Sequence, residues 1–117
     1  MSGAAIVKLT NMPEGVTDWS RTPAAEVPGA SGAASVRMHQ IGPVQLRVVE
    51  YTPGYLADHW CSKGHVIYVI DGALTIEHEG DAPGCPLSAG MSWYVADDEG
   101  TRHRVRSHGG ATIFILD

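Results

Sequence analysis

The stretch RHRVRSHGGATIFIL, residues 102–116, decides the fold class of this 117-residue chain. Its first six residues alternate strictly, so an extended strand sends the three arginines to one face and His103, Val105 and Ser107 to the other. Two glycines then mark a turn, and residues 111–116 follow as an apolar strand. This pattern predicts antiparallel β-structure.

Further short strands, separated by turn residues, are predicted upstream at 44–48, 66–70, 73–77 and 92–95. Pro53-Gly54 predicts a turn, and Asp71-Gly72 predicts a two-residue hairpin. Strands spaced in this way indicate an antiparallel sandwich or barrel. We therefore expect two regions: an N-terminal arm over residues 1–34, irregular where Ala, Pro and Gly are frequent, and an all-β barrel over residues 35–117.

The composition excludes several classes of protein. The length allows one hydrophobic core, and 44% hydrophobic residues are enough to form it. A net charge of -5 without a basic stripe argues against a nucleic-acid partner. No apolar run approaches the roughly 20 residues that span a bilayer, no secretory leader is evident, and only two cysteines occur. We expect a cytoplasmic protein that does not insert into a membrane.

The segment Asp58-His-Trp-Cys-Ser-Lys-Gly-His65 contains three potential metal ligands within seven residues. His59 and Cys61 lie two residues apart, so an extended backbone turns both to the same face. His65 follows a bend and can return to the same point, and His103 is a fourth candidate on its alternating strand. Imidazole and thiolate ligands suit zinc, with iron, copper or nickel as the other candidates, rather than magnesium or calcium.

The pattern His59-x-Cys61-x3-His65-x6-Gly72 resembles the first motif of the cupins, with Cys61 in place of the usual second histidine and His65 in place of glutamate. The second cupin motif is matched in part, by Gly90, Gly100 and His103. This resemblance implies a jelly-roll β-barrel with a metal site inside it.

The chain resembles more closely the DHCW-motif cupin-fold family of small bacterial proteins, through Asp58-His-Trp-Cys61 and Lys63-Gly-His65. The similarity extends over most of the chain. It implies a single-domain cupin, often dimeric, with a metal-binding pocket in the barrel, and it names no reaction.

Two functions remain open. Three imidazoles with Cys61 absent or weakly bound would leave a coordination position free, as in metal-dependent enzymes that act on a small organic molecule by isomerisation, lyase or oxygenase-type chemistry. Four ligands, with Cys61 bound, would close the site and favour a non-catalytic metal-binding or small-molecule-sensing module. For the enzyme, Tyr94 and Glu99 are candidate catalytic residues, and Asp58 is a candidate acceptor that orients a ligand imidazole.

The remaining residues of interest have simpler interpretations. We expect three histidines to lie at the surface (His39, His78 and His108), Cys85 to be a free thiol, and the arginines of 102–106 to face away from His103. The run 66–70 is apolar on both faces and needs cover on both, which predicts a homodimer.

Overall fold

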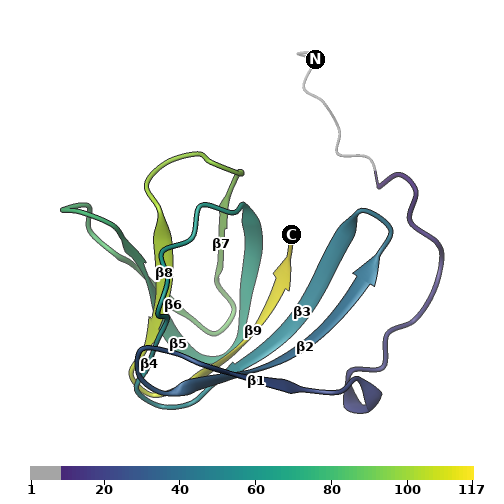
Figure 1. Ribbon diagram of the computed structural model, residues 1–117, viewed down its shortest axis with the longest axis horizontal. Helices are drawn as coiled ribbons and strands as arrows, with labels where there is room; N and C mark the ends of the chain where they lie inside the picture. The colour runs from purple at the N-terminus through teal and green to yellow at the C-terminus, as the bar shows by residue number, and fades with distance from the viewer. Residues whose placement is uncertain (1–8) are drawn as a thin grey trace.

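The computed structural model describes residues 9–117, and over these residues the chain is almost entirely β-structure (Figure 1). A short 3-10 helix, η1, precedes nine strands. Their bounds are η1 Trp19–Arg21, β1 Ala25–Pro28, β2 Ala33–Ile41, β3 Val44–Tyr51, β4 Tyr55–Leu56, β5 His65–His78, β6 Cys85–Ser88, β7 Ser92–Val95, β8 His103–Ser107 and β9 Ala111–Leu116.

All strand pairings are antiparallel, and the main path of the sheet runs β1-β2-β3-β9-β5-β8-β4. The sheet curls into a half-barrel, with β2 and β3 on one wall and β8, β6 and β4 on the other (Figure 1). The prediction of an all-β antiparallel barrel is therefore confirmed.

Strand β5 belongs to both walls of the half-barrel. Its first half pairs with β7 and β9, and its second half pairs with β6 and β8. Its 14 residues would span roughly 46 Å if straight. The strand bends instead, so that the rings of its first residue, His65, and its last, His78, each lie 6.4 Å from the ring of Trp93.

The hairpin predicted at Asp71-Gly72 is wrong, because β5 continues through both residues. Gly72 has a φ of 77°, which a hairpin turn would also require, but here it pairs with Ala111 of β9, directly after a bulge at which the register shifts between Val69 and Asp71. A Cβ at Gly72 would meet the Gly110 carbonyl oxygen at 2.3 Å. The glycine thus serves the bend of a continuous strand that packs closely against the turn before β9.

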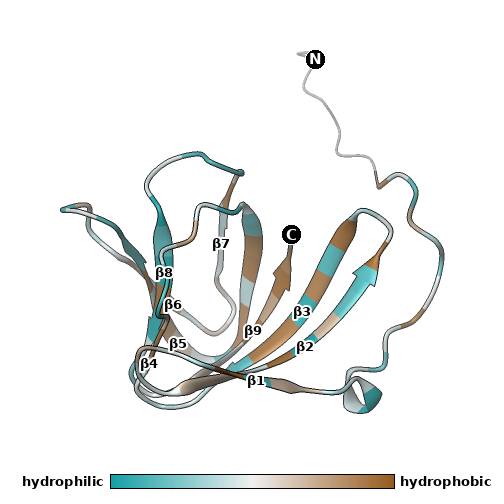
Figure 2. Ribbon diagram, in the orientation of Figure 1, coloured by the Kyte–Doolittle hydropathy of each residue, from teal (hydrophilic) through white to brown (hydrophobic). Residues whose placement is uncertain are grey.

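The core lies on the inner face of the curled sheet, where alternate residues of the strands point inward. Figure 2 shows hydrophobic residues concentrated along β3, β9 and the first half of β5. The fully enclosed side chains are Val69, Ile76, Ile113 and Ser107. Ser107 donates a hydrogen bond of 2.7 Å to the Ala73 carbonyl, which satisfies its buried hydroxyl.

The N-terminal segment follows the outer face of β2 before it joins the sheet. The side chain of Arg37 donates hydrogen bonds to the carbonyls of Trp19 and Thr22, at 2.9 and 2.8 Å. Residues 25–28 lie in the stretch that we expected to be irregular, but they form β1, which pairs with β2. The first eight residues of the predicted arm lie outside the described residues. Along residues 9–117, no helix has the length and apolarity needed to cross a membrane.

Candidate metal centre

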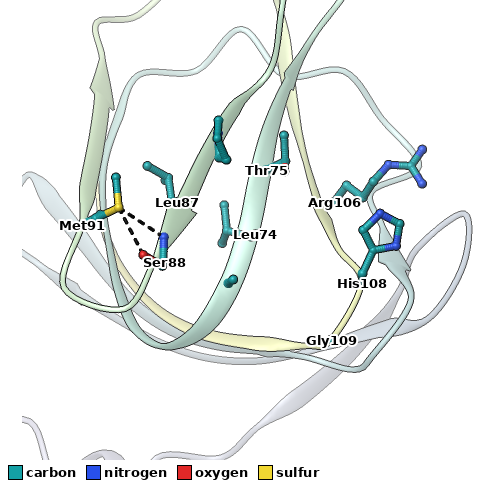
Figure 3. Close-up of a pocket in the computed structure, with 10 residues that line it drawn as sticks. Leu74, Thr75, Leu87, Ser88, Met91, Arg106, His108 and Gly109 are labelled. Carbon is teal, nitrogen blue, oxygen red and sulfur yellow. Dashed lines mark hydrogen bonds between the residues drawn. The ribbon is translucent and has the colours of Figure 1, made fainter.

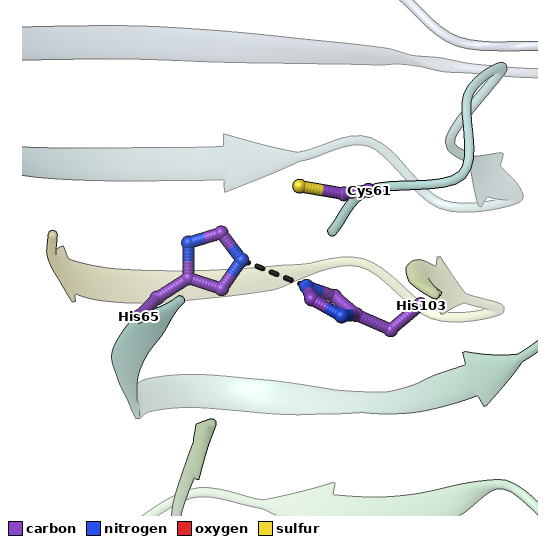
Figure 4. A group of neighbouring side chains, drawn as sticks. All are labelled: Cys61, His65 and His103. Atoms are coloured by element: carbon purple, nitrogen blue, oxygen red, sulfur yellow. Dashed lines mark hydrogen bonds between the residues drawn. The ribbon is translucent and has the colours of Figure 1, made fainter. Parts of the chain in front are cut away.

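Three side chains from three separate segments meet at one point: Cys61, His65 and His103 (Figure 4). Each offers one ligand atom, and these atoms all lie within 4.8 Å of one another. The Nε2 atoms of the two imidazoles are 2.8 Å apart. The structure thus brings together three of the four residues that the sequence predicts as metal ligands.

Cys61 and His103 are held opposite each other by the backbone. They form an isolated antiparallel bridge, in which the Cys61 amide donates to the His103 carbonyl at 2.8 Å and the His103 amide donates to the Cys61 carbonyl at 2.9 Å. Residues paired in this way have side chains on the same side of the ladder. His103 begins β8 and points inward with Ser107, as the alternation predicts.

His65 begins β5, and Gly64 before it allows a close approach to the end of β7. A Cβ at Gly64 would meet the Asp97 amide nitrogen at 2.5 Å and the Val95 carbonyl oxygen at 2.8 Å. The Gly64 amide also donates to the Asp97 carboxylate at 2.7 Å. Any larger residue at position 64 would push the start of β5, and with it His65, away from β7.

A buried carboxylate, that of Asp117, contacts the His65 ring at Nδ1, the nitrogen that does not face His103. Asp117 Oδ2 lies 3.0 Å from His65 Nδ1, and the same carboxylate is ion-paired with Arg47. Its side chain is only 1% exposed. Burial raises the pKa of Asp117, but the hydrogen bond with His65 and the charge of Arg47 outweigh burial and leave the pKa below its ordinary value.

Burial disfavours the charged forms of both imidazoles of the site. The pKa of His103, which is 4% exposed, falls to about 4 through burial first and then through the charges of His65 and His78. Burial also lowers the pKa of His65, although its hydrogen bond to Asp117 opposes the shift. A neutral imidazole has a free lone pair, which is the form that binds a metal.

The thiol of Cys61 has a donor beside it, because the Lys63 amide lies 3.3 Å from Sγ and donates to it. Cysteine binds a metal as the thiolate. Two imidazole nitrogens and one thiolate within a few ångströms of one another suit a transition-metal ion. The donor set of this centre therefore fits such an ion.

The ring of Trp93 lies next to His103, and an open hollow lies next to His65. The ring of Trp93, on the inner face of β7, lies 4.8 Å from the ring of His103. A hollow of about 440 Å³ beside His65 is also lined by Val66, Tyr94 and Asp117, and it includes neither Cys61 nor His103. A second hollow of about 450 Å³, lined by residues such as Leu87, Met91 and Arg106, includes none of the three ligand candidates (Figure 3).

The structure does not bring His59 into this group. Its side chain is 85% exposed and its Nδ1 atom contacts the Asp58 carboxylate. The chain bends at residues 58 and 59, so the extended backbone that would turn His59 and Cys61 to one face is absent there. Asp58, expected as an acceptor for a ligand imidazole, contacts His59 instead of His65 or His103.

Of the two candidate catalytic residues, Tyr94 lines the hollow beside His65, whereas Glu99 lines neither that hollow nor the group of three ligand candidates. Tyr94 pairs with Val66 across the β5–β7 ladder and is 74% exposed on the outer face, so its side chain points away from the barrel interior. Glu99 lies in the exposed loop between β7 and β8. It is Trp93, one residue before Tyr94, that faces the site.

The other histidines and the second cysteine lie outside the centre. His39 and His108 are exposed, as expected, whereas His78 is half-buried, with its Nδ1 atom 3.0 Å from the Pro83 carbonyl oxygen. Over residues 9–117 both cysteines are free thiols, which agrees with the prediction for Cys85.

The sequence did not lead us to assign a role to Asp117 or Trp93, although the alternation of residues along their strands predicts that both face inward. Asp117 continues the inward series Ile113 and Ile115, so the parity of β9 places a carboxylate on the inner face. Trp93 pairs with Ile67, two residues beyond His65, and so shares its face.

Comparison with known proteins assigns the fold. No protein-family model and no curated protein sequence matches the chain. Among solved structures, the ectoine synthase of P. lautus is similar at a TM-score of 0.70 and 16% identity, over 88% of this chain and 76% of that one. A Thermotoga maritima protein described as a predicted oxalate decarboxylase is similar at a TM-score of 0.69 and 12% identity, over 86% of this chain and 96% of its own.

A third similar structure connects the fold to a named class. The sugar phosphate isomerase from a cupin superfamily of Silicibacter pomeroyi has a TM-score of 0.68 and 13% identity, over 87% of this chain and 74% of that one. The chain thus has the single-domain β-barrel fold of cupin proteins, together with a possible Cys/His/His metal site.

Proposed function

We propose that this protein is a metal-binding cupin that holds one transition-metal ion with Cys61, His65 and His103 and acts on a small organic molecule at that ion. The observation that carries the proposal is the convergence of the three ligand atoms within 4.8 Å. Zinc is the proposed metal, since an imidazole and thiolate set is typical of zinc sites.

Three protein ligands leave a coordination position for a substrate or water, as in catalytic zinc sites. A bound zinc ion there would polarise a carbonyl oxygen or activate water, which suits isomerase or lyase chemistry, whereas oxygenase-type chemistry would require a redox-active metal such as iron in its place. The chain's own residues shield part of the site from water, because His103 is buried and the ring of Trp93 packs against the ring of His103.

The alternative, a closed four-ligand module, needs His59 as the fourth ligand. That would require the exposed His59 ring to leave its contact with Asp58 and swing inward. We therefore favour the open site. We further propose membership of the DHCW-motif cupin-fold family and, because the site needs a reduced thiolate, a cytoplasmic location.

The test is metal analysis of purified protein with matched variants. We expect about one equivalent of zinc in the wild type, and a loss of at least tenfold in affinity for Cys61→Ala and His103→Ala. His59→Ala is the control and should retain the wild-type affinity. A wild-type protein that binds no transition metal on titration would overturn the proposal.

The same experiment separates the open from the closed site. If His59→Ala loses metal as strongly as Cys61→Ala does, the site has four ligands and the non-catalytic module is correct. Substituting cobalt adds a direct readout, because a thiolate-to-cobalt charge-transfer band should be present in the wild type and absent in Cys61→Ser.

A further inference from the structure

The Asp117 carboxylate, which is ion-paired with Arg47, is held next to the His65 ring by the backbone of two strands. Asp117 directly follows β9, and its backbone is fixed against β3: the Gln45 amide donates to the Asp117 carbonyl at 2.7 Å, and the Asp117 amide donates to the Gln45 carbonyl at 3.0 Å. Arg47 lies two residues after Gln45 on the same face of β3, so its guanidinium reaches the same carboxylate.

The buried carboxylate determines which nitrogen of His65 carries the proton. An ionised carboxylate has only acceptor atoms, so the His65 nitrogen 3.0 Å from Asp117 Oδ2 must be the one that carries hydrogen. An imidazole that binds a metal is neutral and has a single N–H. The lone pair of His65 is therefore on Nε2, which faces His103 Nε2 at 2.8 Å.

We propose that Asp117 is a positioning residue that fixes the tautomer and orientation of His65 as a metal ligand, and that Arg47 holds Asp117 in place. This inference rests on the proposed metal site but adds residues that no ligand pattern contains. Arg47 is needed because a buried carboxylate without a charged partner is costly. Lys63, with Nζ 3.6 Å from Asp117 Oδ1, adds a second positive charge at the rim.

The effect on metal binding should be large enough to measure. Losing a partner that orients a ligand histidine typically costs 10–100-fold in metal affinity. We expect this loss for zinc binding to Asp117→Ala. Asp117→Asn keeps an acceptor oxygen of the same shape but loses the charge, so it should restore part of the affinity. Asp18→Ala, which removes an exposed carboxylate paired with Arg21, is the control and should bind zinc as the wild type does.

A second measurement needs no metal and separates positioning from stability. In nitrogen-15 NMR of the metal-free protein, wild-type His65 should carry its proton on Nδ1. In Asp117→Ala the ring should return to the tautomer mixture of a free imidazole, and Asp117→Asn should fall between the two. If Asp117→Ala does not fold, Asp117→Asn, which has nearly the same shape, carries the test.

The outcomes distinguish this inference from the proposed function. An unchanged His65 tautomer in Asp117→Ala overturns the positioning role, even if zinc affinity falls, because the loss is then one of stability. A wild-type protein that binds no metal overturns the proposed function, while the tautomer measurement still decides whether Asp117 sets the proton position of His65.

Discussion

His103 combines deep burial with a titratable ring, and this makes the stability of the metal-free protein sensitive to acid. In the folded chain its pKa is about 4, against an ordinary value of 6.5 in the unfolded chain. Between these two values the unfolded state binds more protons than the folded state, so stability falls as the pH is lowered. His65 shifts in the same direction and adds to this effect.

We predict that the unfolding free energy of metal-free protein falls between pH 6.5 and pH 4, and that His103→Gln weakens this dependence. One fully linked histidine contributes a slope of up to about 1.4 kcal/mol per pH unit. Urea unfolding in the presence of a chelator, at several pH values, measures both slopes. His108→Gln is the control, because that ring is exposed. Equal slopes for the wild type and His103→Gln would contradict the prediction.

Strand β8 shows how alternation serves two purposes in one element. Its inward residues carry the ligand His103 and the core residue Ser107, and its outward arginines pair with β5. Arg104 and Arg106 each donate from Nε to one oxygen of Glu77, at 2.8 and 2.7 Å. The prediction that these arginines face away from His103 is confirmed.

Because Glu77 is paired with Arg104 and Arg106, its ionisation should make the unfolding free energy depend on pH. The hydrogen bond from Arg106, followed by that from Arg104, lowers the pKa of Glu77 despite partial burial. A carboxyl with a lowered pKa contributes its stability above its ordinary pKa of 4.5 and loses it as the pH falls through the lowered value. We expect Glu77→Gln to cost about 1 kcal/mol of unfolding free energy at pH 7.

The destabilisation by Glu77→Gln should become smaller as the pH is lowered below 4.5, because Glu77 is progressively protonated and loses the charge on which its pairing depends. Thermal or urea unfolding at pH 7 and at pH 3 measures this. Glu26→Gln, on the exposed strand β1, is the matched control and should leave stability nearly unchanged at both pH values. A destabilisation by Glu77→Gln that is as large at pH 3 as at pH 7 would show that charge is not its cause.

The elements were predictable where the local pattern agrees with the tertiary fold. Strands β7 and β9 match the predicted bounds 92–95 and 111–116, because their residue types and flanking turns all favour the same structure. The Asp71-Gly72 hairpin prediction failed because a glycine with positive φ can lie within a strand as well as in a turn, and here Asp71 and Gly72 pair with Thr112 and Ala111 of β9. Asp117 could not be assigned a role because its partners, Arg47 and His65, are distant in sequence.

The outer face of the half-barrel is apolar over several adjacent strands. Residues paired across β7, β5 and β9 place Tyr94 beside Val66 and Val66 beside Leu116, and Tyr68 lies beside Phe114. Val66 is 47% exposed and Tyr94 is 74% exposed. Contiguous apolar surface of this kind is typical of an interaction site.

We therefore keep the prediction of a homodimer and assign it to this face. The wild type should sediment as a dimer at micromolar concentration, and Val66→Lys should sediment as a monomer, because a lysine at the centre of the apolar face would be desolvated in the dimer. Val66→Lys should still bind zinc, since His65 and Ile67 point to the other side of β5. A monomeric wild type would contradict the prediction, and Val16→Lys, in the N-terminal segment, is the control.

The sheet order has a consequence for how the chain folds. Strand β9 lies between β3 and β5 but follows both in the chain, so these two strands cannot be joined in the sheet until residues 111–116 are available. Until then the edge of β3 and the first half of β5 have unpaired backbone groups, which are sites for aggregation. Closure also requires contacts between distant residues, and folding should be slow for a domain of this size. The insertion of β9 is the step at which Asp117 meets His65, so the carboxylate support of the metal centre forms only when the barrel closes.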